Sequence, residues 1–495
     1  MYASMSFFML VAGAILAALV ACVAMAGAVQ LTSRRVHGYL HLIFYAMVLL
    51  VALGTLLSVR DLSIVSLNLE DAAPQPRHPL LEWIQPLMSL LMMAVAGERI
   101  LSFWLRREAT VSAPVVLLTG FVIFWLCTVA APGFLSAHPY FSHDHAYSLI
   151  LGIAAVLVCT AERDIAFKTA RNALMIFMLA SLLLIFFRPS LVLDRSYTQG
   201  LLPGVPRLAG LAPHAISLSV FAQLGLISLL AFPYQRAWLH YLAWFVGLVV
   251  LFLSQSKTAW ISFFLCWLCF VVVQNGPNFS RRLGDPARPG AGILSVVLVM
   301  FGILGAGLVL MFGDIGTRVD TFFNSAEGVQ LASLTGRDKI WAIAFEEWRR
   351  NPVFGYGPLI WEIDFRINIA MPNATHGHNQ FMDTLSRSGT VGASALVIYA
   401  LVLMAMSLRY ARESKGLTLA LFTLLVVRSI SEVPLQLQGY SPEFVAHLLL
   451  LMTLAAATNE SRIRKTLAAR PSRQATAFSK PSLGKNSMRT ARPGT

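Results

Sequence analysis

The sequence predicts an all-α polytopic membrane protein, a bundle of about twelve or thirteen transmembrane helices with one long polar loop that carries an amphipathic helix. The 495 residues are 57% hydrophobic and only 13% charged, and the mean hydropathy is +0.68. Such a composition excludes an ordinary soluble enzyme. Because lipid offers the backbone no hydrogen-bond partners, long apolar segments are expected to be helices packed as a bundle.

Thirteen apolar segments approach the roughly 20 residues that a spanning helix needs. In chain order they are 6–31, 38–58, 80–97, 111–132, 146–160, 172–187, 215–232, 239–253, 258–274, 291–312, 389–407, 417–430 and 442–457. Several are short, so twelve spanning helices is the alternative. The first segment lacks a basic stretch before it and is longer than the apolar run of a signal peptide, so we expect it to be retained.

The cysteines all lie inside these segments and indicate packing rather than chemistry. Two of them form a CxxC pattern, which in a membrane helix favours small apolar side chains over a redox or metal site. The five are Cys22, Cys127, Cys159, Cys266 and Cys269.

The net charge of +14 follows the membrane topology. With the N-terminus outside, most Lys and Arg beyond the long loop fall in inward loops and the C-terminal tail, as the positive-inside rule requires. We therefore expect an inward C-terminus and no nucleic-acid partner. Four regions follow: an N-terminal transmembrane bundle (1–312), a long outward loop (313–388), C-terminal transmembrane helices (389–457) and a disordered basic tail (458–495) that touches anionic lipid.

This topology places the notable polar segments on one side of the membrane. The outward segments are 188–214, 254–258, 313–388 and 431–441, whereas the inward loops are short and carry little besides basic residues. A functional site built from several loops is therefore expected on the outer face.

The long loop ends in the motif THGHNQFMDTL at 375–385. His378 is the candidate general base, because histidine can take a proton near neutral pH; a structural histidine is the alternative. The HxH spacing of His376 and His378 also invites a metal ion. We expect no metal, because the other outward histidine cluster, at 138–145, has no spacing that guarantees a shared site.

Three outward cations are candidates for binding an anion. Arg207, in the Pro- and Gly-rich run 206–214, offers a planar fork suited to phosphate oxygens, although lipid head groups or loop carbonyls are equally good partners. Lys257 stands between two apolar helices, where it either snorkels to water or meets an anion. Arg337 begins a helix whose positive end also favours an anion, with an ordinary surface arginine as the alternative.

The helix that Arg337 begins has an apolar stripe over 340–348 that includes two tryptophans. The pattern predicts an amphipathic helix on the outer leaflet, ended by Asn351 and Pro352. The turn 355–358 that follows is expected to be architectural.

Two charges fall near the outer end of the twelfth segment. Arg428 and Glu432 lie four residues apart, and charges at such depth tend to pair or to mark a pathway. We expect an intrahelical ion pair; the alternative is that these residues line a cavity for a head group.

The sequence resembles the O-antigen ligase and O-antigen polymerase superfamily of bacterial envelope glycosyltransferases. The likeness rests on GRDKIW (336–341) leading to NPVFGYG (351–357), on HNQFMDTL (378–385) with Gly389 and Gly392, and on the helix opening at 254–260. The run around Arg207 is similar to a further family element. Together these features span about residues 200–405.

This resemblance implies transfer of a glycan from undecaprenyl diphosphate to an acceptor hydroxyl, on the periplasmic side of the inner membrane, without nucleotide sugar, metal or other cofactor. His378 would be the base or would orient the acceptor, with His376 as the fallback. Arg207 and Arg337 would bind the diphosphate, and Lys257 would lie near it. The C-terminal tail would then be cytoplasmic.

Further residues are expected at the substrate: Asn379 beside His378, Arg387 toward phosphate or lipid head groups, and Arg428 in the head-group cavity. Two departures from the family pattern stand out. Lys257 occupies a position where many relatives have arginine, which removes bidentate phosphate binding there. Ser386-Arg387-Ser388 stands where many have an acidic residue.

The resemblance leaves the acceptor open. A ligase acting on lipid A–core is slightly favoured over a polymerase, which would extend O-antigen or exopolysaccharide on a second lipid-linked glycan. A protein O-oligosaccharyltransferase ranks last, because no large soluble C-terminal domain is seen. From other classes, a lipid-linked glycan transporter would use charges within the bundle and internal repeats, which are not evident. A scaffold of a polysaccharide machine would not need His378.

Overall fold

The computed structural model describes residues 38–62, 78–106, 113–195, 202–283 and 337–468, except Val59, Pro203 and Asn373, together with isolated positions 25, 27, 30, 300 and 301. Apart from those positions, the expected segments 6–31 and 291–312, the first part of the long loop and the tail beyond residue 468 lie outside the described residues.

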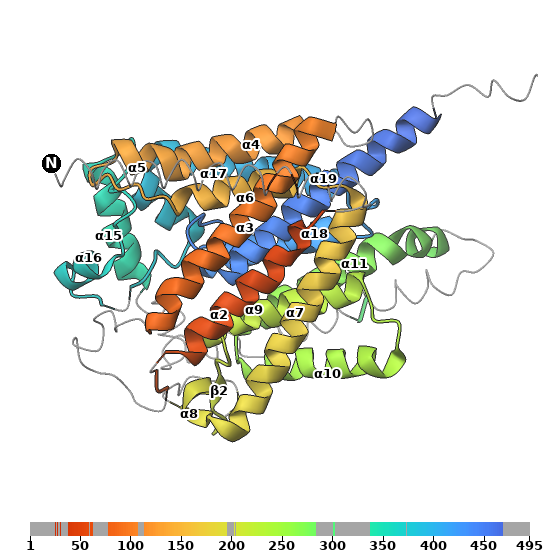
Figure 1. Ribbon diagram of the computed structural model, residues 1–495, viewed down its shortest axis with the longest axis horizontal. Helices are drawn as coiled ribbons and strands as arrows, with labels where there is room; N and C mark the ends of the chain where they lie inside the picture. The colour runs from red at the N-terminus through yellow and green to blue at the C-terminus, as the bar shows by residue number, and fades with distance from the viewer. Residues whose placement is uncertain are drawn as a thin grey trace, which may run out of the picture.

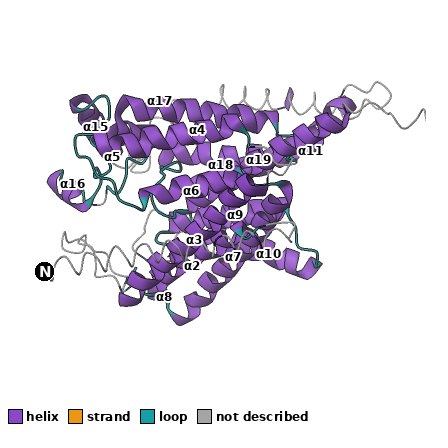
Figure 2. Ribbon diagram, turned by 45° about the horizontal axis from the view of Figure 1, so that its top comes forward, coloured by secondary structure: helices purple, strands orange, loops and turns teal. Residues whose placement is uncertain are grey.

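The secondary structure of the described chain is almost entirely helical, with only two short strands, which confirms the predicted all-α polytopic fold (Figures 1 and 2). The helices are α2 (Ile43–Leu56), α3 (Pro79–Arg106), α4 (Val115–Trp125), α5 (Ala131–Leu135), α6 (His145–Val156), α7 (Thr160–Phe187), α8 (Pro189–Val192), α9 (Ala215–Ala231), α10 (Ala237–Leu253), α11 (Lys257–Leu283), α15 (Arg337–Arg350), α16 (Ile363–Asn368), α17 (Gln380–Arg409), α18 (Leu417–Ser431) and α19 (Pro442–Ala468). A 3-10 turn, η1 (Leu40–Leu42), precedes α2, and a π-helical turn, η3 (Leu126–Ala130), joins α4 to α5.

Six of these helices are long and apolar enough to cross a membrane: α3, α4 continued through α5, α7, α11, α17 and α19. Five shorter apolar helices, α2 with its 3-10 turn, α6, α9, α10 and α18, complete the bundle. Each of the eleven overlaps an expected segment, although α7 begins at Thr160, before its expected segment 172–187, and α17 begins at Gln380, before 389–407. The protein is therefore a multi-pass membrane protein.

Helix α19 lies at the centre of the bundle. In the apolar stretch of α19, 89% of the residues are buried inside the protein, whereas the corresponding shares for α3 and α11 are only 17% and 22%. A helix that is apolar all round and buried all round belongs in the core, while a peripheral helix turns apolar side chains to lipid. Phe186 and Phe187, 83% and 79% exposed at the end of α7, are such side chains.

Helix α17 bends at Gly389, whose φ of 62° and ψ of −160° interrupt the helical ladder. The interruption frees backbone groups on both sides of the bend, and they pair with the turn 352–357 instead. The four bonds run from the N–H groups of Tyr356, Gly357, Thr390 and Val391 to the carbonyls of Ser386, Arg387, Pro352 and Val353, at 2.8, 3.1, 2.8 and 3.2 Å.

Two glycines permit this close crossing. A Cβ on Gly389 would lie 2.3 Å from the carbonyl oxygen of Val353, and a Cβ on Gly355, which has a φ of 73°, would lie 2.6 Å from that of Ser386. The turn after α15 is thus architectural, as expected, and it fixes the long loop to the membrane helix that follows.

Helix α15 begins and ends where the sequence predicted, but its apolar stripe faces protein as well as the surface. Ile340 and Ala344 are buried in a small second core with Trp361 and Phe365, while Phe345 is 46% exposed. Figure 1 shows α15 and α16 at one end of the bundle, opposite the far end of α19. Helix α15 is therefore amphipathic, as expected, and part of its apolar stripe packs on other residues of the long loop.

Candidate active site

Three side chains from two segments far apart in the chain meet at one end of the bundle: His376 and His378 from the loop before α17, and Glu432 from the end of α18. The Nε2 atom of His376 lies 3.2 Å from Oε2 of Glu432. The two imidazole rings are 4.1 Å apart between centroids, tilted by 53°. Their ligating atoms all lie within 4.8 Å of one another.

The hydrogen bonds of His376 assign its tautomer. Its Nδ1 accepts the backbone N–H of His378 at 3.1 Å, so in the neutral ring the proton is on Nε2, directed at Glu432. Glu432 is 8% exposed. Its burial alone would raise the carboxyl pKa, but the hydrogen bond from His376 and the charge of Arg428 outweigh that effect and lower it. Glu432 is thus an anion that orients His376.

His378 is held as a neutral imidazole. Burial, followed by the neighbouring His376, lowers its pKa to about 4, and Arg337 acts in the same direction against Glu432 and Asp383. Its Nδ1 is buried and has no hydrogen-bond partner among the described residues. Its backbone φ is 46°, an uncommon conformation for a residue with a side chain. A neutral ring with a free nitrogen can accept a proton or bind a polar ligand.

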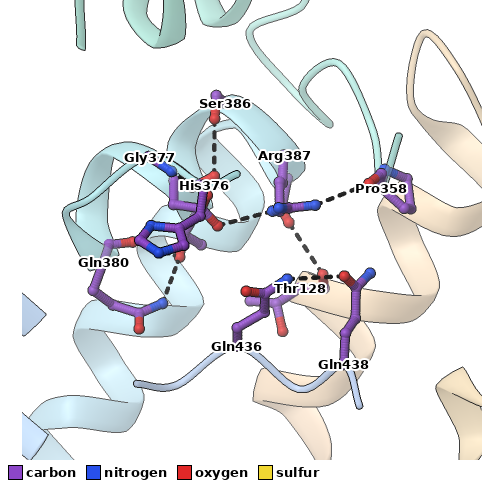
Figure 3. Close-up of polar contacts among 12 residues, drawn as sticks. Thr128, Pro358, His376, Gly377, Gln380, Ser386, Arg387, Gln436 and Gln438 are labelled. Carbon is purple, nitrogen blue, oxygen red and sulfur yellow. Dashed lines mark hydrogen bonds and ion pairs between the residues drawn. The ribbon is translucent and has the colours of Figure 1, made fainter. Parts of the chain in front are cut away.

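A buried ion pair beneath the motif fixes this loop. Asp383, 1% exposed, accepts the N–H of Gly377 at 2.8 Å and the Nε–H of Arg387 at 2.8 Å. Arg387 also donates to the carbonyl of Pro358 at 2.8 Å (Figure 3). A Cβ on Gly377 would lie 2.9 Å from Cβ of Asp383, so the loop approaches the helix this closely only with glycine there.

The start of α17 is fastened to the segment 431–441. The side chain of Asn379 accepts the N–H groups of Phe381 and Met382 at 3.0 and 3.1 Å, as a helix cap, and donates to the carbonyl of Ile430 at 3.3 Å. Gln380 accepts the N–H of Leu435 at 2.7 Å. Asn379, expected at the substrate, therefore joins the start of α17 to the end of α18.

The loop 188–214 and the turn before α11 also meet. Strands β1 (Leu193–Asp194) and β2 (Arg207–Leu208) form a two-stranded antiparallel sheet in which Arg207 stands opposite Asp194. The Nε–H of Arg207 donates to the carbonyl of Ser254 at 2.8 Å. Lys257 begins α11 three residues later and is exposed. The two predicted phosphate-binding cations are thus brought to one turn.

Arg60 clamps the loop that carries Arg207. Its guanidinium donates to four backbone carbonyls, and its pKa is lowered to about 10 by burial, which Asp194 partly opposes. The acceptors are the carbonyls of Leu191, Gly210, Ala212 and Pro213. Arg60 therefore plays a structural role in shaping this part of the site.

His214 links the two halves of the site electrostatically. It stands directly before α9, and its pKa is lowered first by burial and then by Arg60, while Glu432 raises it and Arg207 and His376 lower it further. Charges from the loop 188–214, the motif loop and the end of α18 thus act on one another, and Arg337 acts on His378. Parts of three polar segments, 188–214, 313–388 and 431–441, therefore lie close to one another.

Two predicted substrate residues have protein partners instead. Arg428, 1% exposed, pairs with Glu443 of α19 at 2.8 Å, and no ion pair joins it to Glu432 within the described chain. The expected intrahelical pair is wrong, because α18 ends at Ser431 and Glu432 takes an extended conformation that turns its carboxylate toward His376. Arg387 is likewise held by Asp383.

The two imidazoles and the carboxylate of Glu432 are also a possible metal-ligand set. Two histidines and one carboxylate suit a divalent transition metal. In the structure, however, the His376 and Glu432 atoms already satisfy each other by a hydrogen bond. The histidines of 138–145 do not converge there: His138 stacks on Tyr356 at 4.2 Å, and His145 contacts Gln438 at 3.2 Å.

Sequence reasoning missed Asp383 and His214 as parts of the site, and it placed Glu432 near the substrate only in the alternative that Arg428 and Glu432 line a head-group cavity. Only Asp383 had a local signal, because it lies four residues before Arg387 on the same helix face. Glu432 and His214 reach the site through tertiary contacts with residues far away in the chain, which no local pattern reveals.

Comparison with known proteins supports the resemblance seen in the sequence. Residues 242–397 match the model of the O-antigen ligase family. The matched region runs from α10 into α17 and includes Lys257, Arg337, His376 and His378, while Arg207 and Glu432 lie outside it. No curated protein matches the chain. The match confirms the likeness to the O-antigen ligase and polymerase superfamily.

Proposed function

Given this O-antigen ligase region, we propose that the protein transfers a glycan from undecaprenyl diphosphate to a hydroxyl of lipid A–core, at the periplasmic face of the inner membrane. The family match supports a glycosyltransferase of the ligase or polymerase type. The observation that carries the proposal is the meeting of His378 with the His376–Glu432 pair, beside the electrostatic influence of Arg337, at one end of a membrane bundle.

In the proposed reaction, the acceptor oxygen attacks C1 of the sugar, the bond from C1 to the diphosphate oxygen breaks, and the hydroxyl proton passes to His378. The neutral ring, with a pKa of about 4, has its lone pair available throughout the physiological range. Binding of the anionic diphosphate would raise that pKa, so His378 would be a stronger base in the complex with the donor. Direct displacement would invert the anomeric centre.

Arg207, Arg337 and Lys257 are the proposed partners of the diphosphate. Negative charge accumulates on this group as it leaves, and fixed guanidinium groups stabilise it without reorganisation. Arg207 is oriented by the carbonyl of Ser254, which leaves the exposed Lys257 nearby as a second, mobile cation. These cations replace the charge stabilisation that a metal supplies elsewhere, so the proposed chemistry requires no metal or cofactor.

His376, Glu432, Asp383 and Arg387 are proposed as positioning residues. Glu432 fixes the ring of His376, whose Nδ1 in turn holds the backbone of His378. Asp383 and Arg387 fix the loop from below. The base is therefore supported by a chain of buried contacts, which is the arrangement that precise proton transfer needs.

The first experiment measures the length of the glycan that remains on undecaprenyl diphosphate in a strain without this protein. Long chains on the lipid are expected, because polymerisation would proceed while ligation stops. Single repeat units would identify a polymerase instead. An unchanged profile, in a host with no second relative, would contradict both enzymes and favour transport or scaffolding.

A further inference from the structure

A polar cavity opens on the same side of the bundle as the candidate site. It has a volume of about 410 Å³ and lies between the start of α3, the loop before α6 and the end of the segment 431–441. Six residues define its chemistry: Glu82, Gln85, Tyr140, Asp144, Tyr147 and Tyr440. None of them belongs to the catalytic arrangement described above.

The lining combines aromatic rings with groups that bind hydroxyls. Sugars present C–H faces that pack on the electron-rich face of an aromatic ring, and hydroxyls that pair with carboxylates and amides. The hydroxyl of Tyr440 lies near Ser89 but makes no hydrogen bond of normal geometry within the described residues, although it is buried. Such a group gains a partner when a polar ligand binds.

The charge of this cavity differs from that of the candidate diphosphate site. Glu82 and Asp144 are acidic, and no Lys or Arg is among the described residues that line it. An anionic phosphate would be repelled there, whereas the diphosphate site offers Arg207, Lys257 and Arg337. The two sites therefore favour different ligands, an anion in one and an uncharged, hydroxyl-rich group in the other.

A continuous segment joins the two sites. Glu432 contacts His376 at one end of it, and Tyr440 lines the cavity at the other. Between them, Gln438 contacts His145 at 3.2 Å and accepts a hydrogen bond from Gln436 at 2.9 Å. Figure 3 shows the hydrogen bond between Gln436 and Gln438. Eight residues of chain span at most about 28 Å, so a ligand in the cavity lies within reach of an oligosaccharide from His378.

We propose that this cavity binds uncharged sugars of the acceptor glycan and so directs an acceptor hydroxyl to His378. The inference rests on the proposed transferase function and adds a subsite for the acceptor, separate from that of the donor. Tyr147 stacks on a sugar ring, and Glu82 and Asp144 accept hydrogen bonds from its hydroxyls.

The test uses the full-length protein in proteoliposomes with a glycan on undecaprenyl diphosphate as donor and lipopolysaccharide without O-antigen as acceptor; a second lipid-linked glycan replaces the latter if the wild type prefers it. Loss of the ring in Tyr147→Ala raises the acceptor KM about tenfold. The double variant E82Q/D144N, which changes exposed carboxylates and leaves packing intact, raises it to a similar extent. Donor KM stays within about twofold in both.

Tyr147→Phe retains the ring and loses less affinity than Tyr147→Ala. The matched control is Asp364→Asn, which removes an exposed carboxylate of α16 that does not line the cavity and leaves both KM values unchanged. An unchanged acceptor KM in E82Q/D144N, or a change in donor KM alone, overturns the subsite while transfer by the wild type upholds the function. A wild type that transfers to neither acceptor overturns the proposed function itself.

Discussion

His376 and Glu432, 56 positions apart in the chain, face each other across 3.2 Å between Nε2 and Oε2. The contact unites the motif loop with the end of α18 and assigns the proton of His376 to Nε2, because Nδ1 accepts the N–H of His378. This pair is the centre from which the function of the site can be tested.

Removal of the Glu432 carboxylate should misplace the histidines. We expect Glu432→Ala to lower kcat for glycan transfer by about 10–100-fold, the loss of a hydrogen bond to a charged group. Glu432→Gln, which keeps an acceptor oxygen for the Nε2 proton, should retain more activity. Single-turnover transfer in proteoliposomes measures both, with elution on gel filtration as the control for folding. Full activity of Glu432→Ala would refute the positioning role.

The pH dependence of kcat/KM reports the pKa of His378 in the free enzyme. Because burial and then His376 lower this pKa to about 4, the neutral, active form prevails above that pH, and activity falls only as the pH drops below about 5. Arg337→Gln removes a charge that lowers the pKa, so its acid limb should move to higher pH. A wild-type limb near pH 6.5, the ordinary value for histidine, would contradict this environment.

The bend of α17 should tolerate no side chain at Gly389. A Cβ there would meet the carbonyl of Val353 in a backbone conformation that other residues rarely adopt. We expect Gly389→Ala to lower the apparent Tm in detergent by about 3 °C or more. Gly54→Ala in α2, where nothing lies within 4 Å of an added Cβ, is the matched control and should match the wild type. Equal Tm values for the two variants would disprove the steric argument.

Breaking the Asp383–Arg387 pair should destabilise the motif loop. Asp383→Ala leaves Arg387 buried without its counter-charge and the N–H of Gly377 without an acceptor, at a cost of about 3–5 kcal/mol. The double variant D383N/R387Q removes both charges and should recover part of the stability. Thermal unfolding and proteolysis of the loop measure the difference; a double variant less stable than Asp383→Ala would exclude this account.

Chelation of metals should leave transfer intact. In the proposed mechanism the cations stabilise the leaving group, and His378 needs a free nitrogen. We expect activity to persist in EDTA, and added Zn²⁺ to inhibit by capturing His376, His378 and Glu432, whose ligand atoms lie within 4.8 Å. Loss of activity in EDTA, restored by one divalent ion, would instead assign these residues to a catalytic metal.

The helices were predictable because lipid permits few alternatives. Uninterrupted apolar runs fixed the places of eleven described helices, and the Asn351-Pro352 pair fixed the end of α15. The surface against which α15 packs was not predictable, because an apolar stripe with Ile340 and Trp341 suits a lipid surface and a protein core equally well. Its partners, Trp361 and Phe365, lie in a part of the loop without clear periodicity.

The sequence by itself determined the membrane bundle, the positions of the polar segments between its helices and the motif around His378. The tertiary structure decided which of those residues meet. Arg428 and Glu432 illustrate the difference: their spacing predicted a pair, yet the end of α18 at Ser431 sends Arg428 to Glu443 and Glu432 to His376. A charged side chain pairs with whichever counter-charge the packed helices bring within reach, and that choice depends on the fold and not on local spacing.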